Sequence, residues 1–206
     1  MNLSDSTRRF YGGGKKTDRI PCAVLRKEIL IMKNVLIVVD MQKDFVNGSL
    51  GTKEAVAIVD AVVEKVKAFD GEVIFTRDTH FENYMETQEG KNLPVVHCIK
   101  DTEGWEIVPE LKTLCEEKGC KCYDKPTFGS TALAEDLKNL YDAGELEAVE
   151  LVGICTDICV VSNALMIKAF MPELQVELDS ACCAGVTPEK HEAALETMRS
   201  CQILVK

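Results

Sequence analysis

The chain has 206 residues, of which 46% are hydrophobic, and its formal net charge is −10. Residues 1–31 carry seven basic and three acidic side chains, so a net charge of −14 falls on residues 32–206. A domain this acidic lacks the basic surface of a nucleic-acid binder, and no apolar run reaches the roughly 18 residues of a membrane-spanning helix. The first residues also lack the apolar core of a secretory signal, which predicts a cytoplasmic protein.

Residues 1–31 differ from the rest of the chain. They are basic, contain the run Gly12-Gly13-Gly14 and show no sustained hydrophobic period. We expect a flexible extension there. The alternative is that translation of the native protein starts at Met32. In both cases the length favours one domain over residues 32–206.

From Met32 onward, apolar runs typical of strands alternate with helical patterns. Val35–Val39 is an unbroken apolar run, as expected of a strand buried on both faces, and apolar residues recur at helical spacing from Val56 to Phe69. Strands separated by helices imply an α/β fold with a parallel sheet and helices on both faces. In chain order, the expected elements are a strand at 35–39, a helix at 53–70, a strand at 73–76, a long loop at 79–104, a helix at 106–118, a strand at 120–123, a helix at 131–143, a strand at 148–152, a helix at 156–170, a strand at 175–179, a helix at 187–201 and a strand at 203–205.

Polar side chains follow four of these predicted strands. Asp40 ends the first, and Asp78 and His80 follow the second. Lys125 follows the third, and Cys159 lies in the first turn of the helix after the fourth. Ligands of open α/β sheets bind beyond the carboxyl ends of the strands. We therefore expect these side chains to meet at one edge of the sheet.

A thiol, a carboxylate and an amine at one edge suit nucleophilic catalysis. Cys159 lies at a helix start, a position that lowers the pKa of a thiol. Asp40 is placed to take the thiol proton, and Lys125 to keep Asp40 ionised. Backbone N–H groups of the turn between Gly153 and Cys159 can hold an oxyanion. Cys155 is a competing nucleophile.

Each of these residues also has a plainer interpretation. Asp40 alone suits a strand-end cap, Lys125 a solvated lysine, and Cys159 a buried thiol. Asp157 is expected to cap the following helix or to favour its dipole. His191 stands between acidic residues in a predicted helix, and we expect it on the surface.

The start of the long predicted loop is a candidate metal site. Asp78 and His80 are two residues apart, Glu89 and His97 follow, and two of the three histidines of the chain lie in this segment. Mixed nitrogen and oxygen ligands suit zinc, iron or manganese. The alternative is a polar loop that holds no ion.

The ten cysteines of the chain are interpreted mainly as reduced core thiols. A secreted disulfide scaffold would be shorter and richer in loops. Cys115, Cys120 and Cys122 leave a metal knot open as an alternative, although no paired zinc spacing supports it.

Five segments of the sequence carry family-specific patterns. They are Val38-Val39-Asp40-Met41-Gln42-Lys43-Asp44-Phe45, Arg77-Asp78-Thr79-His80, Leu93-Pro94-Val95-Val96-His97-Cys98, Asp124-Lys125-Pro126-Thr127-Phe128-Gly129-Ser130 and Gly153-Ile154-Cys155-Thr156-Asp157-Ile158-Cys159-Val160. In this order they resemble the isochorismatase-like cysteine hydrolases, a family that includes the nicotinamidases. The resemblance implies a three-layer α/β sandwich with a six-stranded, mainly parallel, Rossmann-like sheet, and often a homo-oligomer.

The resemblance also implies an activity and the residues that perform it. The protein would be a cysteine amidohydrolase that cleaves a small amide through a thioacyl-enzyme, with nicotinamide as the leading substrate. Asp40 would be the general base, Lys125 its charged partner and Cys159 the nucleophile. A cis peptide bond before Cys155 would help to build the oxyanion hole from the backbone of Cys155 and Cys159.

A metal and an aromatic pocket belong to the same expectation. Nicotinamidases usually carry aromatic residues where this chain has Thr79 and Pro94, so Phe45 and Trp105 are the candidates for walls around the substrate ring. The metal would be divalent, zinc first, with iron or manganese as alternatives. Its expected ligands are Asp78, His80, His97 and, as the fourth, Glu89.

Two other functions stay open. A metal-free relative cleaves carbamoyl or ureido compounds with the same cysteine, lysine and aspartate, and the set of Asp78, His80 and His97 argues against it. A non-catalytic, thiol-rich metal or redox-binding protein would keep its function in a Cys159→Ala variant. An isochorismatase that cleaves a vinyl ether is disfavoured, because those enzymes lack the nucleophilic cysteine.

Overall fold

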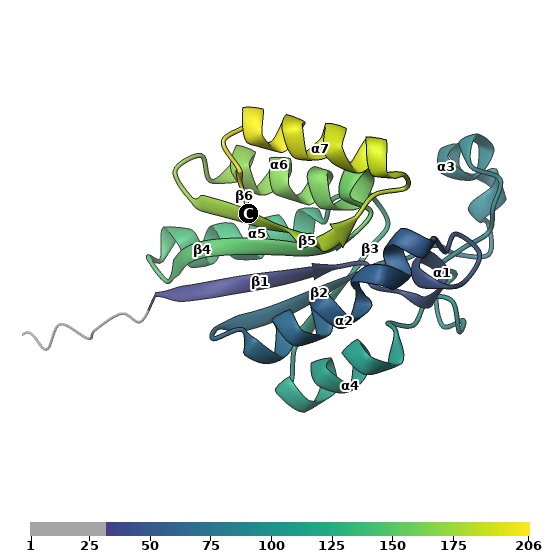
Figure 1. Ribbon diagram of the computed structural model, residues 1–206, viewed down its shortest axis with the longest axis horizontal. Helices are drawn as coiled ribbons and strands as arrows, with labels where there is room; N and C mark the ends of the chain where they lie inside the picture. The colour runs from purple at the N-terminus through teal and green to yellow at the C-terminus, as the bar shows by residue number, and fades with distance from the viewer. Residues whose placement is uncertain (1–31) are drawn as a thin grey trace, which may run out of the picture.

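The computed structural model describes residues 32–206 and folds them into three layers (Figure 1). The middle layer is a six-stranded sheet in which every neighbouring pair is parallel, in the order β3-β2-β1-β4-β5-β6. This confirms the predicted α/β sandwich, whereas the predictions for residues 1–31 lie outside the described residues. The strands are β1 (Lys33–Val39), β2 (Glu72–Asp78), β3 (Lys121–Lys125), β4 (Leu146–Ile154), β5 (Gln175–Ala184) and β6 (Leu204–Val205).

The longer helices form the two outer layers, and short helical segments lie at the carboxyl ends of the strands (Figure 1). In chain order they are α1 (Lys43–Val46), α2 (Lys53–Ala68), the 3-10 turn η1 (Tyr84–Glu86), α3 (Gln88–Asn92), α4 (Pro109–Lys118), α5 (Thr131–Asp142), the π-helical turn η2 (Thr156–Val160), α6 (Val161–Phe170) and α7 (Pro188–Ser200). Residues of α2 and α4 share one apolar cluster with the sheet, and residues of α5, α6 and α7 share the other (Figure 1). No helix within residues 32–206 is long and apolar enough to cross a membrane.

β1 shows why the central strands are apolar throughout. Val35, Ile37 and Val39 pack into the cluster with α5, α6 and α7, while Leu36 and Val38 pack into the cluster with α2 and α4. Alternate side chains of a strand point to opposite faces of the sheet. A strand between two helical layers therefore needs an unbroken apolar run.

The buried face of α2 differs from the predicted one. Ala55, Ile58, Val62 and Val66 are buried, whereas Val56 is 53% exposed. The four buried residues are spaced by three or four positions, which places them in one stripe facing the sheet. The apolar repeat predicted the helix correctly but included a valine that faces solvent.

Element ends account for the other differences. The predicted loop at 79–104 contains η1 and α3, and α4 begins three residues later than predicted, at Pro109. Gly119 ends α4 with a φ of 64°, the left-handed conformation that glycine adopts without steric cost. β5 runs on to Ala184, five residues beyond its predicted end, because Cys183 and Ala184 pair with the end of β4.

The strand order fixes where a site can form. β1 lies between β2 and β4, so the chain moves to one side of β1 for β2 and β3 and to the other side for β4, β5 and β6. Connections that depart to opposite sides leave a crevice at the carboxyl ends of the central strands. The candidate polar residues follow those ends.

Candidate functional site

Asp40 lies directly after β1, and its side chain is fully buried. Its φ of 48° is in the left-handed region, which is uncommon for a residue other than glycine. The Thr76 hydroxyl donates a hydrogen bond to Oδ1 at 2.7 Å, and Lys125 Nζ lies 2.6 Å from Oδ2. Side chains from β2 and β3 therefore hold both oxygens of this carboxylate.

Lys125 ends β3 and places a buried ammonium between two carboxylates and a thiol. Its Nζ lies 2.6 Å from Asp40 Oδ2, 3.4 Å from Asp78 Oδ1 and 3.4 Å from Cys159 Sγ. Burial acts to lower the pKa of Lys125, but Asp40, Cys159 and Asp78 together raise it above its usual value. The ammonium form is therefore kept inside the protein, where an unpaired charge would be costly.

Cys159 lies in η2, the turn between β4 and α6, and is buried. The peptide bond between Ile154 and Cys155 is cis, which is the feature implied by the resemblance. Gly153 has a φ of 113°, and a Cβ there would lie 2.2 Å from the carbonyl oxygen of Val39. Only glycine allows β4 to approach β1 this closely just before the turn that carries Cys159.

Burial dominates the acid–base properties of these groups. It raises the pKa of the Cys159 thiol well above the ordinary value, Asp40 adds to the rise and Lys125 opposes it. The expectation that the helix start lowers this pKa is thus wrong, because desolvation outweighs the helix end. Burial also raises the pKa of Asp40, against the opposing effect of Lys125. A neutral thiol therefore faces a carboxylate with raised proton affinity, a pair suited to proton transfer.

A second polar cluster adjoins the first. Asp78 Oδ2 lies 2.8 Å from His80 Nε2 and 3.6 Å from His97 Nε2, and Glu89 Oε1 lies 3.6 Å and 3.8 Å from the same nitrogens. One ligand atom from each residue lies within 4.8 Å of the others. Ligands of a tetrahedral zinc, at about 2.0–2.1 Å from the ion, lie about 3.3 Å from one another. The cluster therefore has the spacing of a small divalent-ion site.

The two imidazoles are oriented as metal ligands. His97 Nδ1 hydrogen-bonds to the Val95 carbonyl at 2.8 Å, which assigns the proton to Nδ1 and leaves Nε2 as the ligand atom. His80 Nε2 is buried and makes no hydrogen bond, although Asp78 Oδ2 is 2.8 Å away. Burial opposes the cationic form of His80, but Asp78 and Glu89 raise its pKa to about 9. The residues fit a divalent metal, with which protons compete.

One cavity of about 560 Å³ opens onto both clusters. This volume is within the range of small-molecule sites. Phe45 lines the cavity, and its ring packs against His97 with centroids 5.4 Å apart. The polar and sulfur-bearing lining residues that belong to the two clusters are Asp78, Glu89, His97, Cys155 and Cys159.

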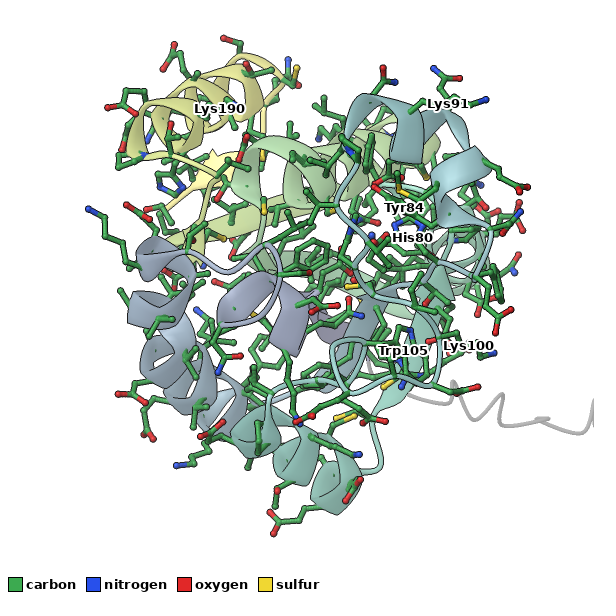
Figure 2. All side chains as sticks on the ribbon, turned by 90° about the vertical axis from the view of Figure 1, so that its right-hand side faces the viewer. His80, Tyr84, Lys91, Lys100, Trp105 and Lys190 are labelled. Carbon is green, nitrogen blue, oxygen red and sulfur yellow. The ribbon has the colours of Figure 1, made fainter. Side chains whose placement is uncertain are left out.

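Trp105 does not take its predicted place. Trp105 is not one of the described residues that line the cavity. Its indole N–H donates to Thr79 Oγ1 at 2.8 Å, and the Arg77 guanidinium lies 3.7 Å from the ring centre. Figure 2 shows Trp105 apart from His80 and Tyr84. Trp105 follows the predicted loop at 79–104, but its sequence position does not show that the indole packs against Arg77 and Thr79 and not in the cavity.

His191 departs from its predicted surface position, whereas Asp157 stands in the first turn of η2, as the helix-dipole interpretation expected. His191 Nδ1 is hydrogen-bonded to the buried Thr156 Oγ1 at 2.8 Å, so the imidazole is attached to η2 and is not a plain surface group. Asp157 accepts a hydrogen bond from the Val186 N–H at 2.9 Å, and η2 has no side-chain cap. Both residues connect η2 to the start of α7. Thr156 and His191 are too far apart in sequence for any local pattern to pair them.

Gln42 holds the edge of the sheet together, and the sequence analysis did not single it out. Its Nε2 donates to the carbonyls of Asp78 at 2.9 Å and Trp105 at 2.8 Å, and its Oε1 accepts from the Asp78 N–H at 2.7 Å. The residue is fully buried. Its place in the first family-like segment was the signal that could have found it.

Tyr84 supports the imidazoles from η1. Its ring lies beside His80 (Figure 2), with centroids 4.7 Å apart. The centroid of the His97 ring is 5.0 Å away. Its hydroxyl donates to the Leu93 carbonyl at 2.8 Å. Nothing in the local sequence distinguishes this tyrosine from an ordinary loop residue.

Known proteins share this organisation. A model of the isochorismatase domain matches residues 34–205. An uncharacterised isochorismatase family protein of Bacillus subtilis (strain 168), PncA, is 30% identical over 173 residues, which is 80% of this chain and 93% of the relative. The crystal structure of a Pyrococcus horikoshii pyrazinamidase in complex with zinc matches with a TM-score of 0.69 and 30% identity, covering 84% of this chain and 98% of that one. A nicotinamidase/pyrazinamidase structure from Bacillus subtilis matches with a TM-score of 0.73 and 30% identity, covering 84% and 99%.

Proposed function

The chain belongs to the isochorismatase family, and on that premise we propose that it hydrolyses nicotinamide to nicotinate and ammonia through a thioacyl-enzyme on Cys159. The observation that carries the proposal is the position of Lys125 Nζ, 3.4 Å from Cys159 Sγ and 2.6 Å from Asp40 Oδ2. Cys159 lines the same cavity as Asp78, Glu89 and His97, three of the candidate metal ligands. The pyrazinamidase and nicotinamidase structures at 30% identity support a heteroaromatic amide as substrate.

The first half of the reaction is acyl transfer to sulfur. As the Cys159 sulfur attacks the amide carbon, Asp40 takes the thiol proton, so a thiolate need not exist beforehand. Lys125 keeps Asp40 ionised before the transfer and stabilises the negative charge that develops on the sulfur as its proton leaves. The backbone N–H groups of Cys155 and Cys159 bind the oxyanion of the tetrahedral intermediate. Asp40 then returns the proton to the amide nitrogen, the carbon–nitrogen bond breaks and ammonia leaves.

The second half is hydrolysis of the thioester. Asp40, again a carboxylate, takes a proton from a water molecule as that oxygen attacks the thioester carbon. The carbon–sulfur bond breaks, Cys159 regains a proton and nicotinate leaves. One carboxylate therefore works alternately as acid and base, which suits the raised pKa that burial gives Asp40.

Substrate positioning is assigned to the second cluster and to Phe45. Asp78, His80, His97 and Glu89 would hold a divalent ion, zinc first. An ion held there would supply Lewis acidity toward a ring nitrogen of the substrate and would so help to orient its amide. Phe45 lines the same cavity and offers an apolar surface to the ring.

Ammonia release from a panel of amides tests the proposal. Nicotinamide and pyrazinamide should be turned over, whereas benzamide, which lacks a ring nitrogen, should be a poor substrate. Cys159→Ala should abolish turnover and keep the fold. Cys201→Ala, which removes an exposed thiol, should leave turnover unchanged. Chelation should abolish activity, and added zinc should restore it.

Two results would favour the other interpretations. Turnover of a ureido compound but not of nicotinamide, insensitive to chelation, would indicate the metal-free amidohydrolase. Full function in Cys159→Ala would indicate a non-catalytic thiol-rich protein. The predicted homo-oligomer and the cytoplasmic location are separate proposals, and light scattering of the purified protein tests the first of them.

A further inference from the structure

A group of cysteines lies away from the cavity, where α4 leads into β3. Cys115 is in the last turns of α4, and Cys122 is the second residue of β3. Their Sγ atoms are 3.4 Å apart. The contact of Cys115 Sγ with Cys120 is to the backbone carbonyl oxygen of Cys120, at 3.9 Å. We propose that Cys115 and Cys122 form a redox-active dithiol that a hydroperoxide converts to a reversible disulfide. This site is independent of the proposed hydrolase activity.

The pair is accessible to a small oxidant. Cys115 and Cys122 line a surface recess of about 110 Å³. Cys122 is half-buried, whereas Cys115 is 6% exposed. Burial, with Cys122 beside it, raises the pKa of Cys115. Cys122 is therefore the thiol that meets the oxidant, and Cys115 is the thiol that resolves the product. The other residues that line the recess are Arg77, Glu106, Ile107, Lys112 and Glu116.

The chemistry balances with one hydroperoxide. The Cys122 thiolate attacks a peroxide oxygen, the oxygen–oxygen bond breaks, and Cys122 becomes a sulfenic acid while hydroxide leaves. The Cys115 sulfur then attacks the Cys122 sulfur, the sulfur–oxygen bond breaks, and water leaves. In total, two thiols lose two electrons and two protons, and hydrogen peroxide is reduced to two molecules of water. A dithiol reductant reverses the oxidation by exchange.

A shared metal is the competing use of three neighbouring cysteines. Within residues 32–206, the group of metal-ligand side chains that converges is Asp78, His80, Glu89 and His97. The ligand atoms of Cys115, Cys120 and Cys122 do not form such a group in this part of the chain. The metal knot left open by the sequence is therefore not supported, and the short distance between two of the three sulfurs favours a disulfide.

Peptide mapping tests the proposal, because trypsin separates the three cysteines. Cleavage after Lys112, Lys118 and Lys121 places Cys115 in peptide 113–118, Cys120 in 119–121 and Cys122 in a peptide that begins at residue 122. The full-length protein is treated with stoichiometric hydrogen peroxide, alkylated and digested without reductant. The expected product joins 113–118 to the peptide of Cys122 with a mass lower by two hydrogens, and dithiothreitol removes it.

Matched serine variants decide which sulfurs are used. Cys120→Ser should keep the cross-linked product, whereas Cys115→Ser and Cys122→Ser should lose it. A cross-link through peptide 119–121, or sulfinic and sulfonic acids on these peptides without any cross-link, would overturn the proposal. The map of the unsubstituted protein gives this answer by itself if a variant fails to fold.

Discussion

The two polar clusters beside the cavity are held in place by different parts of the fold. Asp40 and Lys125 stand at the ends of strands, and their side chains are fully buried. Glu89 lies on the short helix α3 with its side chain 24% exposed, and His97 lies in the connection that follows. Backbone ladders fix strand ends, whereas a long connection depends on a few side-chain contacts. Asp40 and Lys125 of the first cluster are thus fixed by the sheet, whereas His80, Glu89 and His97 of the second belong to the connection between β2 and α4.

Asp78 is the residue where the two clusters meet. Its Oδ1 lies 3.4 Å from Lys125 Nζ, and its Oδ2 lies 2.8 Å from His80 Nε2. A substitution at Asp78 would therefore disturb both clusters, and their separate contributions to stability and activity could not be told apart. We call Asp40, Lys125 and Cys159 the sheet cluster, and His80, Glu89 and His97 the connection cluster. Substitutions in one cluster at a time test whether the sheet cluster stabilises the fold and the connection cluster does not.

The largest effect is expected from Lys125→Met. This change leaves the carboxylate of Asp40 buried without its partner, and breaking a buried ion pair costs about 3–5 kcal/mol of unfolding free energy. Urea denaturation measures the loss, and turnover should fall with it. Lys121→Met on the same strand removes an exposed pair with Asp136 and should cost at most about 1 kcal/mol. Equal losses of unfolding free energy in the two variants would show that the buried pair at the strand end contributes no more than the exposed pair.

His97→Gln should separate metal binding from folding. Loss of one imidazole ligand should lower bound zinc, measured by elemental analysis, and should lower kcat/KM by about 100-fold or more. Glu89→Gln should cost about tenfold, because this carboxylate is partly exposed and farthest from the imidazoles. In chelator, both variants should unfold at the same urea concentration as the unsubstituted protein. A shift as large as that of Lys125→Met would show that the connection also carries the fold.

Much of the fold and part of the site followed from sequence alone. Strands that are buried on both faces leave an unmistakable apolar run, as at Val35–Val39, and the residue after such a run has its place fixed by the sheet. Trp105 and His191 were misplaced because their partners, Thr79 and Thr156, are set by tertiary packing. The direction of the Cys159 pKa was also wrong, because desolvation depends on all surrounding residues and not on position in one helix.

The raised pKa of Cys159 gives a pH test of the sheet cluster. Below the ordinary thiol pKa of about 8.5, the Cys159 thiol is protonated in both the folded and the unfolded chain. Its ionisation then does not change the free energy of unfolding. Above this pH, the Cys159 thiol ionises in the unfolded chain but stays protonated in the folded one. The free energy of unfolding therefore falls as pH rises. The rate of Cys159 alkylation by iodoacetamide should accordingly keep rising above pH 9, with the exposed Cys201 as reagent control. A plateau near neutral pH would mean that Lys125 outweighs burial.

The smallest effect is expected from His191→Phe. The hydrogen bond to Thr156 is worth about 1 kcal/mol, so kcat should fall by about fivefold while KM changes little. Thr197→Ala on the same helix removes an exposed hydroxyl and serves as the control. If kcat is unchanged in His191→Phe, then η2 keeps its shape without support from α7.

The three hydrogen bonds of the Gln42 amide limit how this cavity can be transplanted. Glutamate at that position would direct a carboxylate at the carbonyls of Asp78 and Trp105, and leucine would leave three backbone groups unsatisfied. A graft that carried only the cavity-lining residues to another scaffold would omit the side chain that ties the segment after β1 to the end of β2 and to the backbone at Trp105. Any minimal version of the site must include this buried amide, although it does not line the cavity.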